Sequence, residues 1–134
     1  MNIDKDLVAA MAAPLVLAIL SDGDSYGYAI LKRVRELSSG ELEWTDGMLY
    51  PLLHRLDRLG HVEAEWGVSP EGRRRRNYRI TDSGRVQLVE QRRQWETATR
   101  TLSGIWDLAT SGGSALSGSG LSRPGLSGPA LAGA

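Results

Sequence analysis

The stretch from residue 44 to residue 80 constrains the fold more than any other part of the chain. A helical pattern covers Trp44 to Leu59, Gly60 follows it, and two short segments of alternating polarity then flank a run of arginines. The segment Gly72 to Arg79 holds five arginines, four of them in the unbroken run Arg73 to Arg76, and no acid, although the formal net charge of the whole chain is zero. A helix with a polar side, followed directly by a basic hairpin, can bind a nucleic acid.

The net charge of zero conceals an uneven distribution. Residues 1–49 carry four basic and eight acidic side chains, whereas residues 50–110 carry eleven basic and eight acidic ones. Fourteen of the sixteen basic residues are arginine, which favours planar, bidentate contacts with phosphates or guanine edges. The sequence has no cysteine, which excludes disulfides and thiolate chemistry and fits a reducing cytoplasm.

Several function classes are excluded by the residues that the chain lacks. The longest apolar run, Leu7 to Leu20, contains Pro14 and is too short for a membrane span, so we expect a soluble, cytoplasmic protein with no membrane partner. His54 and His61 are the only histidines, and no acid completes a metal-ligand set with them. No nucleophile grouping, phosphate-cradling loop or carboxylate pair can be assembled. We therefore expect no enzyme activity, no metal and no cofactor.

The spacing of apolar residues predicts two helices before residue 40. The first covers Leu7 to Leu20, with a break or kink at Pro14. The second is predicted to run from Ser25, as its N-cap, to about Ser38. Its predicted apolar face consists of Tyr28, Ile30, Leu31, Val34 and Leu37.

A third helix is predicted to begin after Thr45, as its N-cap, and to end at Gly60. At about 100° per residue, its leucines fall within one sector. These are Leu49, Leu52, Leu53, Leu56 and Leu59. The opposite side carries Gly47, Tyr50, Pro51, His54, Arg55 and Arg58. This polar side is the candidate surface for reading DNA.

Two short strands are predicted after the third helix. Val62, Ala64 and Trp66 alternate with polar residues, which is the period of a half-buried strand. Arg76, Tyr78 and Ile80 alternate in the same way after a loop predicted over Gly67 to Gly72. Three helices and a hairpin predict a mostly α fold with a small β-hairpin wing, an α+β winged helix-turn-helix over residues 1–81.

A long helix is predicted over residues 82–110. Apolar residues recur along it every seven positions, namely Leu88, Trp95, Leu102 and Ala109, with Ala98 and Ile105 on the adjoining seam. The first 80 residues have their own core, so a second copy of the chain is the natural partner of this dimerisation helix. Residues 111–134 consist of Gly, Ser, Ala, Leu and Pro with one charged residue and are predicted to be a disordered tail.

Three segments resemble the PadR family of transcriptional regulators. They are Tyr26-Gly27-Tyr28, Met48 to Leu56, and Arg75 to Thr81 followed by Gly84. The resemblance covers residues 14 to about 108 and departs from the family at Met48, where a threonine is usual. It implies a homodimeric winged-helix repressor of the smaller subgroup, with one helix after the wing.

In this family the last helix packs with the first to form the dimer interface. The resemblance therefore implies interface positions at Leu7, Met11, Leu88, Trp95, Ala98, Leu102 and Ile105. Some similar proteins stack flat aromatic molecules between paired tryptophans, which implies an effector site at Trp95. The alternative is that Trp95 only fills the interface, because a large aromatic at such a position buries much apolar area in either case.

The candidate DNA contacts lie on the third helix, at the start of the second helix and on the hairpin. They are Tyr26, Thr45, Gly47, Tyr50, His54, Arg55, Arg73, Arg74, Arg75, Arg76 and Tyr78. The arginine run is expected to bind phosphates, and Arg79 is a further candidate because it alternates onto the side of Arg75. The alternatives are a plain solvated helix face and, for Tyr26-Gly27-Tyr28, a motif that only orients the second helix against the third.

These observations predict a sequence-specific DNA-binding transcriptional regulator. It would be a homodimeric repressor on a pseudo-palindromic operator, with half-sites about 34–36 Å apart or a multiple of that, and a small aromatic or lipophilic effector would release it. The alternative is a winged-helix protein-interaction module that places its basic wing on an acidic partner.

Overall fold

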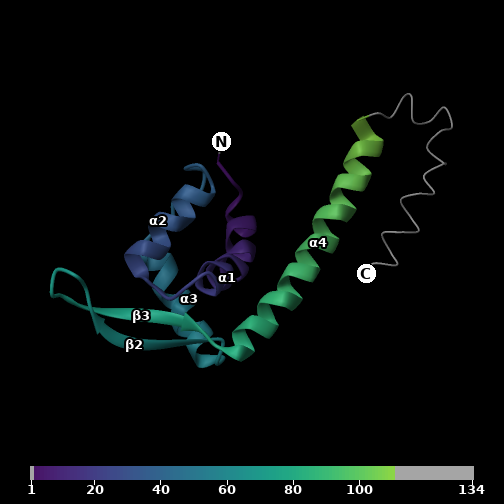
Figure 1. Ribbon diagram of the computed structural model, residues 1–134. Helices are drawn as coiled ribbons and strands as arrows, with labels where there is room; N and C mark the ends of the chain where they lie inside the picture. The colour runs from purple at the N-terminus through teal and green to yellow at the C-terminus, as the bar shows by residue number, and fades with distance from the viewer. Residues whose placement is uncertain (1, 111–134) are drawn as a thin grey trace. The chain divides into compact units, whose positions relative to one another are not determined.

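The computed structural model describes residues 2–110. The chain divides into two units, residues 1–91 and residues 92–134. Four helices and three strands follow one another along the described residues (Figure 1). They are α1 (Lys5–Ser21), β1 (Ser25–Tyr26), α2 (Gly27–Leu37), α3 (Asp46–Arg58), β2 (Val62–Val68), β3 (Arg74–Ile80) and α4 (Asp82–Thr110). The predicted tail, residues 111–134, lies outside the described residues.

Helix α1 confirms the first predicted helix and is continuous through Pro14. The side chain of Asp4 accepts hydrogen bonds from the backbone N–H groups of Asp6, at 3.0 Å, and Leu7, at 3.4 Å. This cap satisfies two donors that have no partner within the helix, which fixes where α1 begins. Its buried residues form one side of the core: Ala12, Val16, Leu17, Ile19 and Leu20.

The second helix begins later than predicted. Ser25 is not its N-cap, because Ser25 and Tyr26 form strand β1 and pair with Tyr78 and Asn77 of β3. Pairing with the sheet overrides the capping preference of serine. The predicted apolar face is also partly wrong: Ile30 and Val34 are buried, whereas Tyr28 is 67% exposed and Leu37 is 55% exposed.

Helix α3 follows the prediction closely. Thr45 occupies the N-cap position, without a side-chain hydrogen bond, and four leucines of the predicted sector are buried. The fifth, Leu59, is the C-cap and is 58% exposed. Gly60 has a φ of +80°, and the N–H groups of Gly60 and His61 bond back to the carbonyls of Asp57 and Leu56, both at 2.9 Å. This Schellman ending turns the chain sharply into β2.

The three strands form an antiparallel sheet in the order β1-β3-β2. Trp66 of β2 lies opposite Arg76 of β3. The hairpin loop is shorter than predicted, because Gly67 and Val68 still belong to β2. The loop closes where the N–H of Ser69 donates to the carbonyl of Arg73 at 2.7 Å. The mostly α fold with a small hairpin wing is confirmed, with β1 as an additional strand.

The core of the first unit lies between α1, α2, α3 and the base of the sheet. The helices contribute their buried leucines, isoleucines and valines, and Val62, Tyr78 and Ile80 contribute from the strands. Leu42 and Trp44, in the segment that joins α2 to α3, are buried as well. Because this core holds the base of the hairpin against the helices, the two strands keep a fixed direction where they extend past it.

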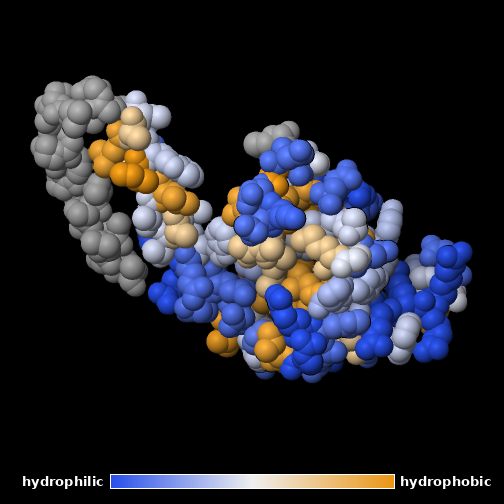
Figure 2. Space-filling model, turned by 180° about the vertical axis from the view of Figure 1, so that it is seen from behind, coloured by the Kyte–Doolittle hydropathy of each residue, from blue (hydrophilic) through white to orange (hydrophobic). Residues whose placement is uncertain are grey.

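Helix α4 begins at a junction with the end of α3. The hydroxyl of Thr81 accepts from the N–H of Gly84 at 3.0 Å and donates to the carbonyl of Gly60 at 2.6 Å. Gly84 is buried, and Leu88 packs against the core. Farther along, Leu102, Ile105, Trp106 and Leu108 are exposed, and Figure 2 shows apolar side chains gathered on this part of α4. No helix among residues 2–110 is both long and apolar enough to cross a membrane.

Candidate nucleic-acid interface

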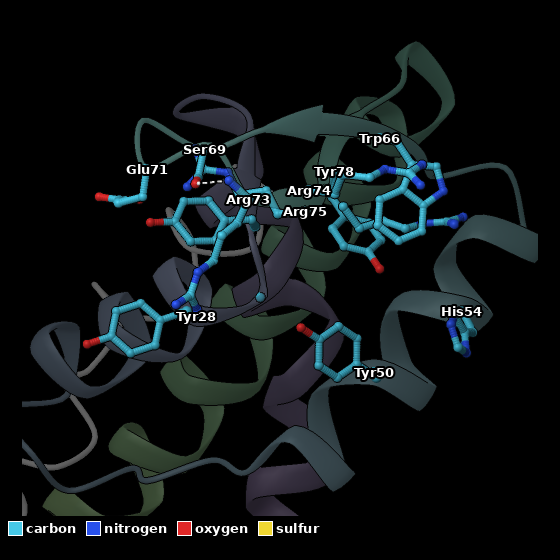
Figure 3. A pocket seen from close by; sticks show the side chains of 13 residues that line it. Tyr28, Tyr50, His54, Trp66, Ser69, Glu71, Arg73, Arg74, Arg75 and Tyr78 are labelled. Carbon is cyan, nitrogen blue, oxygen red and sulfur yellow. Dashed lines mark hydrogen bonds between the residues drawn. The ribbon is translucent and has the colours of Figure 1, made fainter.

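A groove of about 810 Å³ lies between the hairpin, the start of α2 and helix α3. We call it the wing groove. It is lined by Tyr26, Gly27, Tyr28, Tyr50, His54, Trp66, Ser69, Glu71, Arg73, Arg74, Arg75, Arg76 and Tyr78 (Figure 3). Aromatic rings and guanidinium groups thus share one concave surface, a combination that suits nucleic acid.

The wing groove brings together most of the predicted DNA contacts. Tyr26, Tyr50, His54, Tyr78 and all four arginines of the run line it. Thr45, Gly47 and Arg55 do not, but all three are exposed on or next to α3. Five lining residues were absent from the predicted set, namely Gly27, Tyr28, Trp66, Ser69 and Glu71.

The wing groove exists because one face of the hairpin changes character along its length. Near the helices this face carries Val62, Tyr78 and Ile80, which are all buried. Beyond Tyr78 the same face carries Arg76 and then Arg74, because alternate residues of a strand point to the same side. Both arginines are exposed, and Figure 2 shows hydrophilic residues gathered over this part of the hairpin. The buried base of the hairpin therefore holds the charged outer part of the same face in the solvent.

Three of the four arginines in the run lie over aromatic rings. The guanidinium carbon of Arg74 is 4.6 Å from the centroid of the Trp66 ring, and that of Arg76 is 5.2 Å from the same centroid. Arg75 points to the other face of the strand and lies over Tyr26, at 3.6 Å. Such contacts attract the cation to the ring face. Among residues 2–110, none of the four has an ion pair with an acid.

Arg79 does not join Arg75 in the wing groove. Its guanidinium pairs with Glu63 at 2.8 Å and approaches Glu65 at 4.0 Å. The hydrogen bond to Glu63 and the charges of both glutamates raise the pKa of Arg79. The cross-strand pairing of Arg79 with Glu63 explains the contact. The positive charge of the wing groove therefore comes from Arg73 to Arg76.

Tyr78, a predicted DNA contact, lines the wing groove but is also part of the core. Only 3% of its surface is exposed. Burial raises the pKa of the Tyr78 hydroxyl, and the charge of Arg76 partly opposes that effect. The Tyr78 hydroxyl therefore stays neutral at physiological pH, and the ring packs in the core at the base of the hairpin.

Tyr50 of α3 packs against Gly27 at the start of α2. The hydroxyl of Tyr50 rests on Gly27 at the first residue of α2, where a Cβ atom would overlap it. Gly27 is buried, and a side chain at this position would displace the Tyr50 hydroxyl. The contact supports the packing interpretation of the Tyr26-Gly27-Tyr28 motif for its central residue, while Tyr26 meets Arg75 as described above.

The described residues offer little for metal chemistry. No group of three or more His, Cys, Asp or Glu residues that could hold a metal ion is found within residues 2–110. His54 lines the wing groove, whereas the ring of His61 is hydrogen-bonded to Ser83 at 3.1 Å. The two histidines therefore lie in different environments.

Comparison with known proteins agrees with this geometry. The model of the transcriptional regulator PadR-like family matches residues 16–90, which include β1, α2, α3 and the whole hairpin. The chain belongs to the PadR-like family of transcriptional regulators. PadR-like regulators are transcription factors rather than enzymes, in agreement with the expectation from the sequence.

Individual relatives support the same assignment. The chain is 43% identical to the transcriptional regulator Rv3488 of Mycobacterium tuberculosis over 70 residues, which cover 52% of this chain and 64% of that protein. A solved structure from Streptococcus mutans is 33% identical and has a TM-score of 0.67, covering 74% of this chain and 89% of its own. A transcriptional regulator from Clostridium thermocellum is 27% identical with a TM-score of 0.68, covering 74% and 96%.

Proposed function

We propose that this PadR-like protein binds double-stranded DNA in a sequence-specific manner and acts as a homodimeric repressor. The observation that carries the proposal is the wing groove, where four arginines stand beside the polar side of α3. Within residues 2–110 these arginines form no ion pair with an acid. A DNA backbone presents the complementary charge at regular intervals, so these arginines suit successive phosphates.

The two parts of the interface have different roles in this proposal. Helix α3 has the width to enter a major groove of about 12 Å. The hydrogen-bond donors of its exposed Arg55 can contact the edge of a guanine. The polar side of α3 also carries Gly47, Tyr50 and His54, and Thr45 lies next to it. In this proposal Arg73 to Arg76 bind the flanking phosphates, which fixes the position of the protein on the DNA but does not read the base sequence.

A second copy of the chain completes the proposed repressor. On α1, Leu7 is 43% exposed, and Met11 is half-buried. On α4, Leu102 and Ile105 are 45% and 56% exposed, and they continue the seven-residue spacing of Leu88, Trp95 and Ala98. Apolar residues left exposed at this spacing favour packing against a partner helix. Two-fold symmetry then requires an operator with pseudo-palindromic half-sites.

The experiment that tests the proposal is a fluorescence anisotropy titration. Duplexes that tile the DNA upstream of the protein's own gene are titrated at several salt concentrations, beside a scrambled duplex. We expect one tile to bind tightly, with an affinity that falls steeply with salt and with two chains bound per duplex. Weak binding to every tile alike would overturn the proposal. A protein-interaction module would show no such preference and would bind an acidic protein instead.

We further propose that a planar aromatic effector releases the repressor by stacking on Trp95, which is half-buried on α4. Adding such a ligand should quench part of the tryptophan fluorescence and lower the DNA affinity. Trp95→Phe should lose the quenching, while Trp106→Phe, which changes a 60% exposed ring on the same helix, should keep it. Unchanged emission across a broad panel of planar ligands would reduce Trp95 to a packing residue.

A further inference from the structure

Trp66 is an exposed aromatic ring on a hairpin that is otherwise dominated by charge. It is 56% exposed, although a tryptophan on a strand of a small domain usually buries most of its ring. Its neighbours are the guanidinium groups of Arg74 and Arg76, at 4.6 Å and 5.2 Å from the ring centroid. Figure 3 shows Trp66 and Arg74 on the hairpin.

The strand register explains why two arginines reach the same ring. Trp66 lies directly opposite Arg76, and the next pairs along the hairpin are Gly67 with Arg75 and Val68 with Arg74. Arg74 is therefore the diagonal neighbour of Trp66 on the same face, which is within reach of a long side chain. Arg75 points the other way and lies over Tyr26. Each face of the strand thus has its own aromatic ring.

A guanidinium group that is stacked on an aromatic ring can still bind phosphate. The hydrogen-bond donors of arginine lie in the plane of the group and point outwards from its edge. An aromatic ring contacts the face instead. Free arginine side chains lose rotamer freedom when they bind, and this loss weakens binding. Arginines that are already held extended over Trp66 lose less rotamer freedom on binding.

We propose that Trp66 is a positioning residue for DNA binding, which holds Arg74 and Arg76 extended so that their edges meet the phosphates. The proposal rests on the proposed DNA-binding function and adds a residue to it. Trp66 itself does not need to touch DNA. Arg75 does not depend on Trp66, because its contact is with Tyr26 on the opposite face.

The first test needs no DNA. In the ¹⁵N-labelled protein, the Nε–H signals of Arg74 and Arg76 should be displaced by the ring current of Trp66. Trp66→Leu keeps apolar bulk but removes the ring, so the displacement should disappear, while the Arg75 signal should stay in place. Signals of Arg74 and Arg76 that are the same in both proteins would show that the contact is absent in solution and would overturn the proposal.

The second test measures binding to the operator duplex at several salt concentrations. Trp66→Leu should weaken binding about three- to tenfold and leave the slope of log affinity against log salt unchanged, because the same phosphates are still neutralised. Trp66→Phe, which restores a ring, should recover most of the affinity. Val68→Ala, which trims a 66% exposed side chain on the same strand, should bind like the wild type.

The outcomes separate the two levels of the proposal. Wild-type protein that binds no duplex in a salt-dependent manner would overturn the DNA-binding function and the positioning role with it. Wild-type binding that Trp66→Leu leaves intact would overturn the positioning role alone. A flattened salt slope in Trp66→Leu would indicate that the hairpin no longer reaches the phosphates at all, so that Trp66 is a structural residue of the wing rather than a positioning residue.

Discussion

Replacing Arg74, Arg75 and Arg76 together with glutamine should lower the affinity for every duplex on the order of a hundredfold at 0.1 M salt. Glutamine keeps a polar, extended side chain but carries no charge, so the counterions that each arginine displaces from DNA stay bound. The slope of log affinity against log salt should fall by about 0.9 for each phosphate that a protomer no longer neutralises. Anisotropy titrations from about 50 to 200 mM salt measure both quantities.

Arg79→Gln is the matched control for this variant. Arg79 lies on the same strand, but its guanidinium is paired with Glu63 at 2.8 Å and lies outside the wing groove. Its replacement should therefore leave both affinity and salt slope nearly unchanged. Arg55→Ala should behave differently again, because replacing a residue that reads bases lowers the preference for the operator over scrambled DNA. Equal losses for Arg79→Gln and the triple variant would contradict the assignment of the phosphate-binding surface.

Patterns with a local physical cause were predictable from the sequence. The leucine sector of α3 and its ending at Gly60 depend on helical geometry and on the positive φ that glycine allows, and both are confirmed. The arginine run likewise identified the charged part of the wing groove, because four charged residues in succession are seldom buried. The alternation along the second strand placed Arg76 on the same face as Tyr78, since side chains two residues apart share a face.

Features that depend on distant parts of the chain were not predictable in this way. Ser25 has the chemistry of an N-cap, but pairing with Tyr78 draws it into the sheet. The burial of Tyr78 was not predictable either, because alternation along a strand does not tell where the covered base of the hairpin ends and its free part begins. The rings under the arginines follow from the pairing register, which fixes cross-strand neighbours only once the loop length is known.

The junction between the hairpin and α4 provides the second large effect. Gly84 is buried, and a Cβ atom there would overlap the backbone carbonyl of His61 and lie 2.7 Å from a side-chain carbon of Ile80. The carbonyl of His61 cannot move freely, because it already accepts a hydrogen bond from the N–H of Thr81 at 3.1 Å. An added methyl group must therefore push the start of α4 away from the sheet.

We expect Gly84→Ala to lower the free energy of unfolding by about 1–3 kcal/mol, the usual cost of overpacking a tight contact. Gly104→Ala is the matched control on the same helix, since among residues 2–110 no atom outside the adjoining helix backbone lies within 4 Å of its added Cβ. That variant should gain up to about 1 kcal/mol from helix propensity. Urea denaturation at one fixed protein concentration measures both, because the stability of a dimer depends on concentration. If both variants gained stability alike, the close approach of α4 to His61 would be refuted, and with it the reason for a glycine at this position.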